Sequence, residues 1–239
     1  MTSSEPLRVV TWNIHHGRGL DGRVDLERIA RVLEPLDADL LALQELDAGR
    51  ARTGGVDQSA ALAARLGMRA IFYEAFEDDD GGRYGHALLT RSAPTRTTLA
   101  PLPRWPLREP RGLIDARVDT RLGPVRAMST HLGLLELERI RQARAIVGRV
   151  RDARHPVVLL GDLNAPSAVP SMRVLRRALA DVTPRPSRER TWPAFCPLLR
   201  LDYVLASGLR GVRGRTVRGG EATVASDHLP LRAELAAVQ

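Results

Sequence analysis

Apolar residues recur along the chain in two patterns, and polar residues interrupt both. Short apolar runs rich in β-branched residues are typical of buried strands, whereas apolar residues at every third or fourth position are typical of helices. The second pattern, with its capping and stop residues, predicts helices at 25–36, 58–66 and 135–151. The first pattern predicts strands at 7–14, 39–43, 69–76, 87–91, 113–118, 125–130, 157–160, 204–205 and 229–238.

The order of these elements indicates the fold class. Strands and helices mix without regular βαβ alternation or internal repeat, so we expect an α/β sandwich rather than a Rossmann or TIM fold. The proline-rich segment 100–112 is interpreted as a loop, because the strand pattern resumes directly after it. The polar, proline-containing segment 183–190 is interpreted as a mobile loop. We therefore predict one domain over residues 1–239, with its core at about 7–235.

Composition narrows the class of protein. With 239 residues, of which 44% are hydrophobic, the chain can bury a sizeable core, which excludes disordered and collagen-like classes. No stretch approaches the roughly 20 apolar residues of a membrane helix, so we expect no membrane span. The N-terminus lacks the pattern of a secretory leader, and we expect a cytoplasmic protein. Cys196 is the only cysteine, which excludes an internal disulfide.

Charge adds one suggestion and one exclusion. The net charge of +8 favours a phosphate-rich partner such as nucleic acid. All 36 basic residues are arginine, however, and their scatter along the chain also fits a GC-rich coding bias. A P-loop is excluded, because that motif requires a lysine. No feature of the sequence indicates an obligate protein partner.

Polar side chains recur where the apolar strands begin or end. In open α/β sheets, ligand sites form at strand ends, where loops diverge and backbone groups are free. One such residue is more often a turn former, but several in one chain indicate a common site. The residues concerned are Asn13, Glu45, His131, Asp162, Asn164, Asp202, Asp227 and His228.

The chemical types of these residues form a coherent set. Glu45, Asp162 and Asp227 offer carboxylate oxygens without cysteine, which suits Mg²⁺ or Mn²⁺. The asparagine amides can orient a water or a phosphate oxygen, and the histidines can donate to phosphate or move protons. Asp202 can hold the tautomer of His228 through a hydrogen bond. Together these groups indicate metal-assisted attack of water on a phosphate ester.

Several short motifs resemble those of the endonuclease/exonuclease/phosphatase superfamily, and they follow that family's order. GDLN at 161–164 and SDHLPL at 226–231 are the most specific. They are accompanied by TWNI at 11–14, QE at 44–45, STH at 129–131 and LDYVL at 201–205. YGHALLTR at 84–91 and TWPAFCPLLRLDYV at 191–204 are similar to the bacterial hydrolase branch of the family. The resemblance covers residues 7–235.

This resemblance implies a fold and a metal site. The fold would be a four-layer α/β sandwich, with two mixed β-sheets flanked by helices. Glu45 would be the principal metal ligand, with Asn13 and Asp227 close by, and the metal would be Mg²⁺ or Mn²⁺.

The resemblance also implies catalytic roles. Asp162 would position or deprotonate the attacking water, and Asn164 would stabilise the phosphoryl oxygens. Asp202 would orient His228, and His131 would contact phosphate or protonate the leaving group. The motifs leave open whether the base is Asp162 or the pair of Asp202 and His228.

Residues that contact the substrate are predicted on weaker patterns. The candidates are Tyr84, Arg91, Arg111 and His15. His15 stands where several nucleases of the family have an acid, and His86 stands where an asparagine is common in the bacterial branch. We expect at most one of His15 and His16 in the site, because successive residues on a strand point to opposite faces.

These observations lead to one prediction and to alternatives. We expect a metal-dependent phosphodiesterase, and its candidate substrates are nucleic acid and phospholipid. The alternative is a phosphomonoesterase acting on a small sugar, inositol or nucleotide phosphate. A non-catalytic nucleic-acid or dinucleotide-binding module is a different class. GRGLDG at 17–22 matches a dinucleotide pattern, but the helical pattern begins only near Leu26, too late to hold a pyrophosphate. A serine hydrolase is disfavoured, because the chain has no G-x-S-x-G motif.

Overall fold

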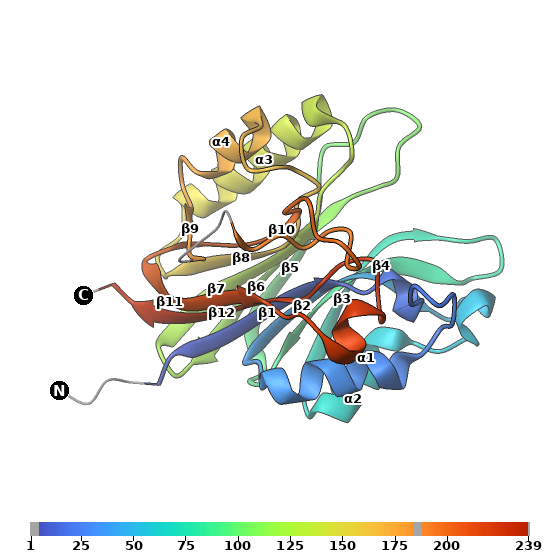
Figure 1. Ribbon diagram of the computed structural model, residues 1–239. Helices are drawn as coiled ribbons and strands as arrows, with labels where there is room; N and C mark the ends of the chain where they lie inside the picture. The colour runs from blue at the N-terminus through green and yellow to red at the C-terminus, as the bar shows by residue number, and fades with distance from the viewer. Residues whose placement is uncertain (1–4, 184–187, 239) are drawn as a thin grey trace.

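A computed structural model describes residues 5–183 and 188–238 of the chain (Figure 1). Two six-stranded sheets lie face to face, with the order β11-β12-β1-β2-β4-β3 in sheet 1 and β5-β6-β7-β8-β10-β9 in sheet 2. Sheet 1 comprises β1 (Leu7–Asn13), β2 (Leu40–Ala48), β3 (Arg69–Glu77), β4 (Arg83–Thr90), β11 (Leu209–Thr216) and β12 (Leu231–Ala237). Sheet 2 comprises β5 (Pro94–Pro101), β6 (Gly112–Thr120), β7 (Gly123–His131), β8 (Val157–Asp162), β9 (Ala180–Asp181) and β10 (Asp202–Ser207).

Helices cover the outer face of each sheet, which makes four layers (Figure 1). The helices on sheet 1 are α1 (Leu26–Leu33) and α2 (Gln58–Leu66), and those on sheet 2 are α3 (Glu136–Arg151) and α4 (Pro170–Leu175). One apolar cluster fills the space between the sheets, and one lies between each sheet and its helices. The alternation along β1 serves both spaces, because Val9 faces the other sheet and Val10 faces the helices. The expected four-layer sandwich is confirmed.

Two parallel strand pairs bring the polar strand ends together. β1 runs parallel to β2, with Asn13 beside Gln44, and β7 runs parallel to β8, with His131 beside Asp162. β10 is antiparallel to β8, so that its first residue, Asp202, pairs with Asp162. Since β1 packs against β8 and β10 across the sandwich, these ends meet at one edge of the molecule.

The two helices on sheet 1 begin at capping aspartates. Asp25 and Asp57 precede α1 and α2, and each side chain accepts a backbone N–H of the first turn. The helix expected at 25–36 changes at Leu33 into a 3₁₀ turn, η2 (Glu34–Leu36), where Pro35 has no N–H to continue the α-helical pattern. No described helix combines the length and the apolar character that a bilayer crossing requires.

The strand predictions hold in the interior of the sheets and at the edge strand β3, and they miss the other edge strands. The strands expected at 113–118 and 125–130 are confirmed as the antiparallel pair β6 and β7. β5 and β11 were not predicted, because these edge strands are largely exposed and carry no apolar run. The loop expected at 183–190 lies partly outside the described residues.

Candidate active site

Asp162 lies at the centre of the edge where β1, β2, β7 and β8 end. Its side chain is buried, and its Oδ2 lies 3.1 Å from Asn13 Nδ2, 3.7 Å from His228 Nε2 and 3.5 Å from His131 Nε2. Its Oδ1 accepts the backbone N–H of Asn164 at 2.9 Å. Groups from both sheets therefore converge on one carboxylate.

His228 lies between two buried carboxylates. Its Nδ1 donates to Asp202 Oδ2 at 2.8 Å, and its Nε2 faces Asp162. Burial lowers the pKa of His228, but the carboxylates of Asp202 and Asp162 outweigh it and raise this pKa to about 10. Burial raises the pKa of Asp162 to about 7. The two carboxylates thus favour the protonated form of His228, and burial favours the protonated form of Asp162.

The segment before β12 is fixed against β1 by two buried contacts. Ser226 Oγ donates to the backbone oxygen of Asn13 at 2.8 Å, and Trp12 Nε1 donates to that of His228 at 2.8 Å. These contacts determine where His228 stands relative to Asn13. Ser226 and Trp12 were not predicted as site residues, because a buried serine or tryptophan beside a strand end has no chemical signature in the sequence.

Asp227 reaches the site from the same segment. Its carboxylate is partly exposed, with Oδ2 at 3.4 Å from Trp192 Nε1 and Oδ1 at 4.0 Å from His15 Nδ1. Trp192 was also not predicted here, since it lies in an irregular loop without a periodic pattern. The predicted metal ligand Asp227 is thus near the site and is oriented by a loop tryptophan.

Arg111 fixes the tautomer of His131. Both side chains are buried, and Arg111 Nη1 lies 2.8 Å from His131 Nδ1. A guanidinium can only donate, so Nδ1 accepts and the proton of the neutral ring is on Nε2. Burial, together with the charge of Arg111, holds the pKa of His131 well below its usual value. His131 is therefore neutral, and its Nε2 lies 3.1 Å from Asn164 Nδ2 and 3.5 Å from Asp162 Oδ2.

The backbone is in the left-handed region at four side-chain-bearing residues of this site. They are His15 (φ 46°), His16 (φ 44°), Glu45 (φ 60°) and Asn164 (φ 48°). Only Asp37 and Leu107 share this conformation elsewhere among the described non-glycine residues. Such conformations cost free energy and cluster at functional sites. The prediction that at most one of His15 and His16 reaches the site is wrong, because the chain leaves β1 at Asn13 and turns through η1 (His15–Gly17).

The donors at this edge fit a divalent cation. The Glu45 carboxylate is partly exposed, and its Oε1 accepts Asn13 Nδ2 at 2.9 Å. One ligand atom each from Glu45, His15 and His16 lie within 4.8 Å of one another. Burial, followed by the charge of Arg52, lowers the pKa of His16 to about 4, which leaves its ring neutral. A carboxylate beside two imidazoles is a suitable donor set for a divalent metal.

Not every predicted residue reaches the site. Arg91 follows the end of β4, where its backbone N–H donates to Asp39 and its guanidinium donates to Asp37, so it lies at the opposite end of sheet 1. His86 is buried between Tyr73 and β7, with Nε2 at 3.2 Å from the backbone oxygen of Ser129. Burial lowers the pKa of His86 to about 3, which indicates a structural residue.

Tyr84 and Arg111 lie near the site, with different surroundings from those expected of substrate contacts. Tyr84 is buried, and its ring lies under the guanidinium groups of Arg50 and Arg52. Arg111 is held by His131 and by Glu109, whose Oε1 lies 2.9 Å away. The contact of Arg111 with His131 suggests that it positions this ring.

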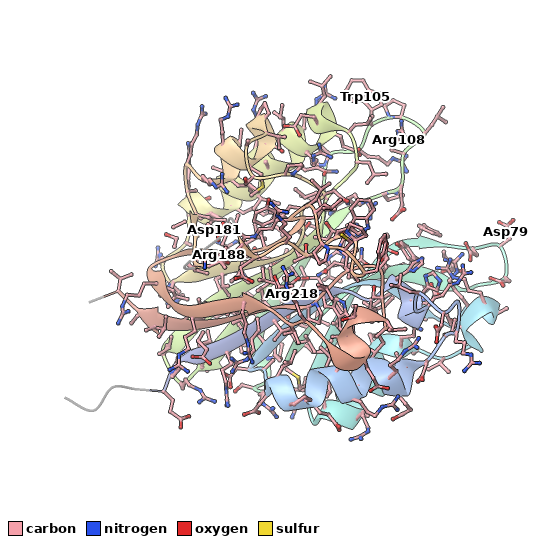
Figure 2. All side chains as sticks on the ribbon, viewed as in Figure 1. Asp79, Trp105, Arg108, Asp181, Arg188 and Arg218 are labelled. Atoms are coloured by element: carbon pink, nitrogen blue, oxygen red, sulfur yellow. The ribbon has the colours of Figure 1, made fainter. Side chains whose placement is uncertain are left out.

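Two loops extend beyond the sheets on the side where β1 ends. Figure 2 shows Trp105 and Arg108 on the loop before β6, and Asp79 on the turn between β3 and β4. The loop before β6 is anchored at Trp105, whose ring is covered by Arg141 of α3 at 4.8 Å. Both loops therefore lie on the same side of the molecule as the end of β1.

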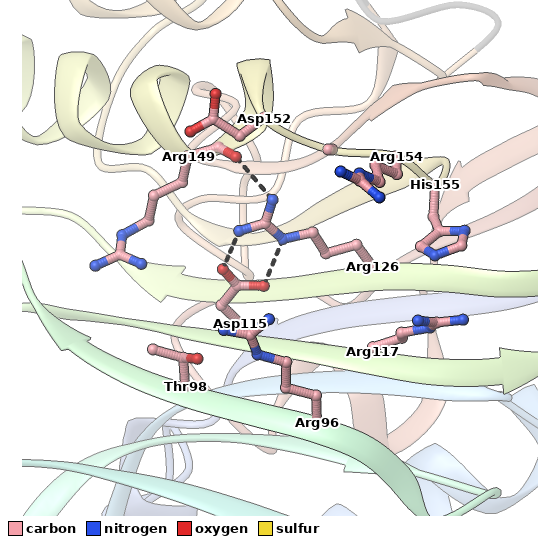
Figure 3. A pocket seen from close by; sticks show the side chains of 10 residues that line it. Arg96, Thr98, Asp115, Arg117, Arg126, Arg149, Asp152, Arg154 and His155 are labelled. Carbon is pink, nitrogen blue, oxygen red and sulfur yellow. Dashed lines mark hydrogen bonds and ion pairs between the residues drawn. The ribbon is translucent and has the colours of Figure 1, made fainter.

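A strongly basic cavity lies elsewhere, beside the end of α3 (Figure 3). It has a volume of about 440 Å³, and five arginines and two aspartates line it. Arg126 is held by both oxygens of Asp115 and by the backbone oxygen of Arg149. Arg96, Arg117 and Arg126 lie in register across β5, β6 and β7. Part of the net positive charge therefore lies beside the first half of β7, away from His131 at the end of this strand.

The carboxylates, imidazoles and amides at this edge are the groups that metal-assisted hydrolysis of a phosphate ester requires. Residues 10–228 match the Endonuclease/Exonuclease/phosphatase family, so the chain belongs to this family. Its members are phosphoric ester hydrolases, and they generally depend on a divalent metal. The resemblance of the sequence motifs is thereby confirmed. None of the curated proteins matches the chain.

Solved structures of this family share the fold. An endonuclease/exonuclease/phosphatase from Beutenbergia cavernae is 28% identical, with a TM-score of 0.82 over 98% of this chain and 72% of that one. A mannosyl-6-phosphatase from Bacteroides thetaiotaomicron is 18% identical, with a TM-score of 0.77 over 96% of this chain and 99% of the other. The human Nocturnin catalytic domain is 21% identical, with a TM-score of 0.76 over 98% and 95%.

Proposed function

We propose that this protein is a divalent-metal-dependent phosphodiesterase that hydrolyses its substrate by in-line attack of water. The observation that carries the proposal is the row from Asp202 through His228 to Asp162, which continues through Asn13 to Glu45. The Asn13 amide thus lies between Asp162, the proposed proton acceptor, and Glu45, the proposed cation ligand. The family membership supports the same reaction class.

In this proposal Asp162 receives a proton from the attacking water as the water oxygen bonds to phosphorus. The P–O ester bond opposite the water breaks in the same displacement, and the departing alkoxide takes a proton from solvent. Its raised pKa of about 7 favours proton acceptance near neutral pH. The His228 imidazolium, held by Asp202, offsets the negative charge that develops at phosphorus. His131 donates its Nε2–H to a phosphoryl oxygen, and Asn164 borders the same space. A divalent cation at Glu45 would polarise a phosphoryl oxygen, with Asn13 and Asp227 as neighbouring groups.

The charge of the site favours a diester over a monoester. His228 is the cation that faces Asp162, while Arg111 is engaged by His131 and Glu109. A phosphodiester carries one negative charge and a monoester carries up to two, so the diester needs fewer cations. Nucleic acid and phospholipid are diesters of this kind. A monoesterase is the second candidate, because a mannosyl-6-phosphatase shares the fold.

The test is hydrolysis of bis-p-nitrophenyl phosphate and of p-nitrophenyl phosphate with Mg²⁺, Mn²⁺ or EDTA. We expect metal-dependent cleavage of the diester, and a loss of at least about a hundredfold in kcat/KM for Asp162→Asn and for His228→Asn. Arg91→Met is the matched control, since Arg91 lies at the other end of the sheet and should leave the rate unchanged. Circular dichroism shows whether each variant is folded.

Three outcomes are informative. Activity that persists in both folded variants, or in EDTA, contradicts the proposed mechanism. A clear preference for the monoester supports the second candidate. Absence of hydrolysis of both compounds with every metal argues against a general phosphodiesterase.

A further inference from the structure

Two adjacent histidines and a glutamate form a compact group of metal-binding atoms at the end of β1. One ligand atom each from His15, His16 and Glu45 lie within 4.8 Å of one another. The two imidazole rings meet edge to face, with centroids 4.5 Å apart. An ion with bonds of about 2.1 Å contacts three such atoms when they come within about 4.2 Å, so small side-chain rotations suffice.

The two rings have no other partner that explains their position. Among the residues that the structure describes, neither ring nitrogen of His16 is hydrogen-bonded, although this side chain is only 9% exposed. The nearest carboxylate to a ring nitrogen of His15 is Asp227, at 4.0 Å. Neither nitrogen is among the fully buried unpaired atoms, so the ring is open to a solvent molecule or to an ion.

The backbone at these three residues is strained, and a buried glutamine holds it in place. His15, His16 and Glu45 all have positive φ, which costs free energy at each residue. Gln58 of α2 stabilises the arrangement, because its Nε2 donates to the backbone oxygen of His16 at 2.8 Å and its Oε1 accepts the N–H of Asp47 at 2.9 Å. The buried amide of Gln58 thus joins η1 to β2 and keeps both histidines beside Glu45.

We infer that His15, His16 and Glu45 form a metal centre with two nitrogen ligands and one carboxylate, which selects a first-row transition ion such as Mn²⁺ or Zn²⁺ over Mg²⁺. Imidazole suits these ions, whereas Mg²⁺ prefers oxygen ligands and retains its water. The use of this ion in catalysis rests on the proposed function, but the binding of the ion does not. The same centre explains why two strained histidines follow Asn13.

The test measures metal binding without turnover. Titration calorimetry of the metal-free protein gives the affinities for Mn²⁺, Zn²⁺ and Mg²⁺, and pulsed electron spin resonance of the Mn²⁺ protein detects coordinated imidazole nitrogen. The variants are His15→Asn and His16→Asn, because asparagine tolerates positive φ but cannot reach the metal. His155→Asn is the matched control, since His155 lies beside the basic cavity.

We expect one bound Mn²⁺ with imidazole nitrogen modulation in the wild-type protein, and tighter binding of Mn²⁺ and Zn²⁺ than of Mg²⁺. Each site variant should weaken Mn²⁺ binding at least about tenfold and reduce the nitrogen modulation, while His155→Asn behaves as the wild type. Bound Mn²⁺ without nitrogen modulation, or unchanged affinity in both variants, would overturn the inference. Nitrogen-coordinated Mn²⁺ in a protein without hydrolysis would refute only the proposed function.

Discussion

At the scale of single residues, His228 lies in a strongly negative environment. It lies between Asp202 and Asp162, and its pKa of about 10 in the folded state exceeds the ordinary value of 6.5. The folded protein therefore holds a proton that the unfolded chain releases above about pH 6.5. This stabilisation is complete below pH 6.5 and is lost as the pH rises through about 10.

We predict that the free energy of unfolding falls between about pH 7 and 10 by up to about 1.4 kcal/mol per pH unit. Asp162, whose pKa is about 7, acts mainly below this range. Urea denaturation at several pH values measures the free energy of unfolding of the wild type and of His228→Asn. The decrease of this free energy per pH unit should be much smaller in the variant. His155→Asn should follow the wild type. Parallel slopes in wild type and His228→Asn would contradict a protonated His228.

At the scale of elements, the close pairing of β7 and β8 sets the distance between His131 and Asp162. Thr130 pairs with Gly161, and the next pair is His131 with Asp162. A Cβ at Gly161 would lie 2.0 Å from the backbone oxygen of Thr130, so only glycine allows this approach.

We predict that Gly161→Ala lowers the free energy of unfolding by at least about 2 kcal/mol, because the two strands must separate. The same movement draws His131 away from Asp162, so hydrolysis should fall at temperatures where the variant is still folded. Denaturation and diester hydrolysis are measured together. Gly148→Ala is the control, since Gly148 is exposed on α3 with free space around it, and it should gain up to about 1 kcal/mol.

The elements also show what the sequence can and cannot predict. β1, β2 and β8 are buried on both faces, so their apolar runs were recognised, and the polar residues at their ends led to the site. The edge strands β5 and β11 were missed because they carry no apolar run, unlike the edge strand β3, which was predicted. The position of His16 was not predicted, because a strand was assumed to continue where the chain turns into η1. The contact of Arg111 with His131 depends on packing across β6 and β7, which no local pattern records.

At the scale of the whole molecule, a group of arginines lies away from the candidate active site. Arg117 lies directly opposite Arg96 on one neighbouring strand and opposite Arg126 on the other. Within the described part of the chain, no carboxylate pairs with Arg96 or Arg117, while Arg126 is paired with Asp115. Like charges that face each other across strands are destabilising.

We predict that Arg117→Thr raises the free energy of unfolding by about 0.5 kcal/mol at low ionic strength, because it removes this repulsion. The gain should largely disappear at about 1 M salt, where charges are screened within about 3 Å. Arg210→Thr is the control, since Arg210 is an exposed strand residue opposite the uncharged Ala236. Equal effects of the two substitutions at both salt concentrations would contradict a specific repulsion.

The left-handed backbone at His15, His16, Glu45 and Asn164 has a further consequence for how this protein can change. Glycine adopts this conformation without strain, so glycine at these positions would relieve the strain and raise the free energy of unfolding. The most direct substitutions toward heat resistance therefore remove the side chains that the proposed chemistry requires. Thermal tolerance and catalysis oppose each other at these residues, so greater thermal tolerance must come from elsewhere in the sandwich.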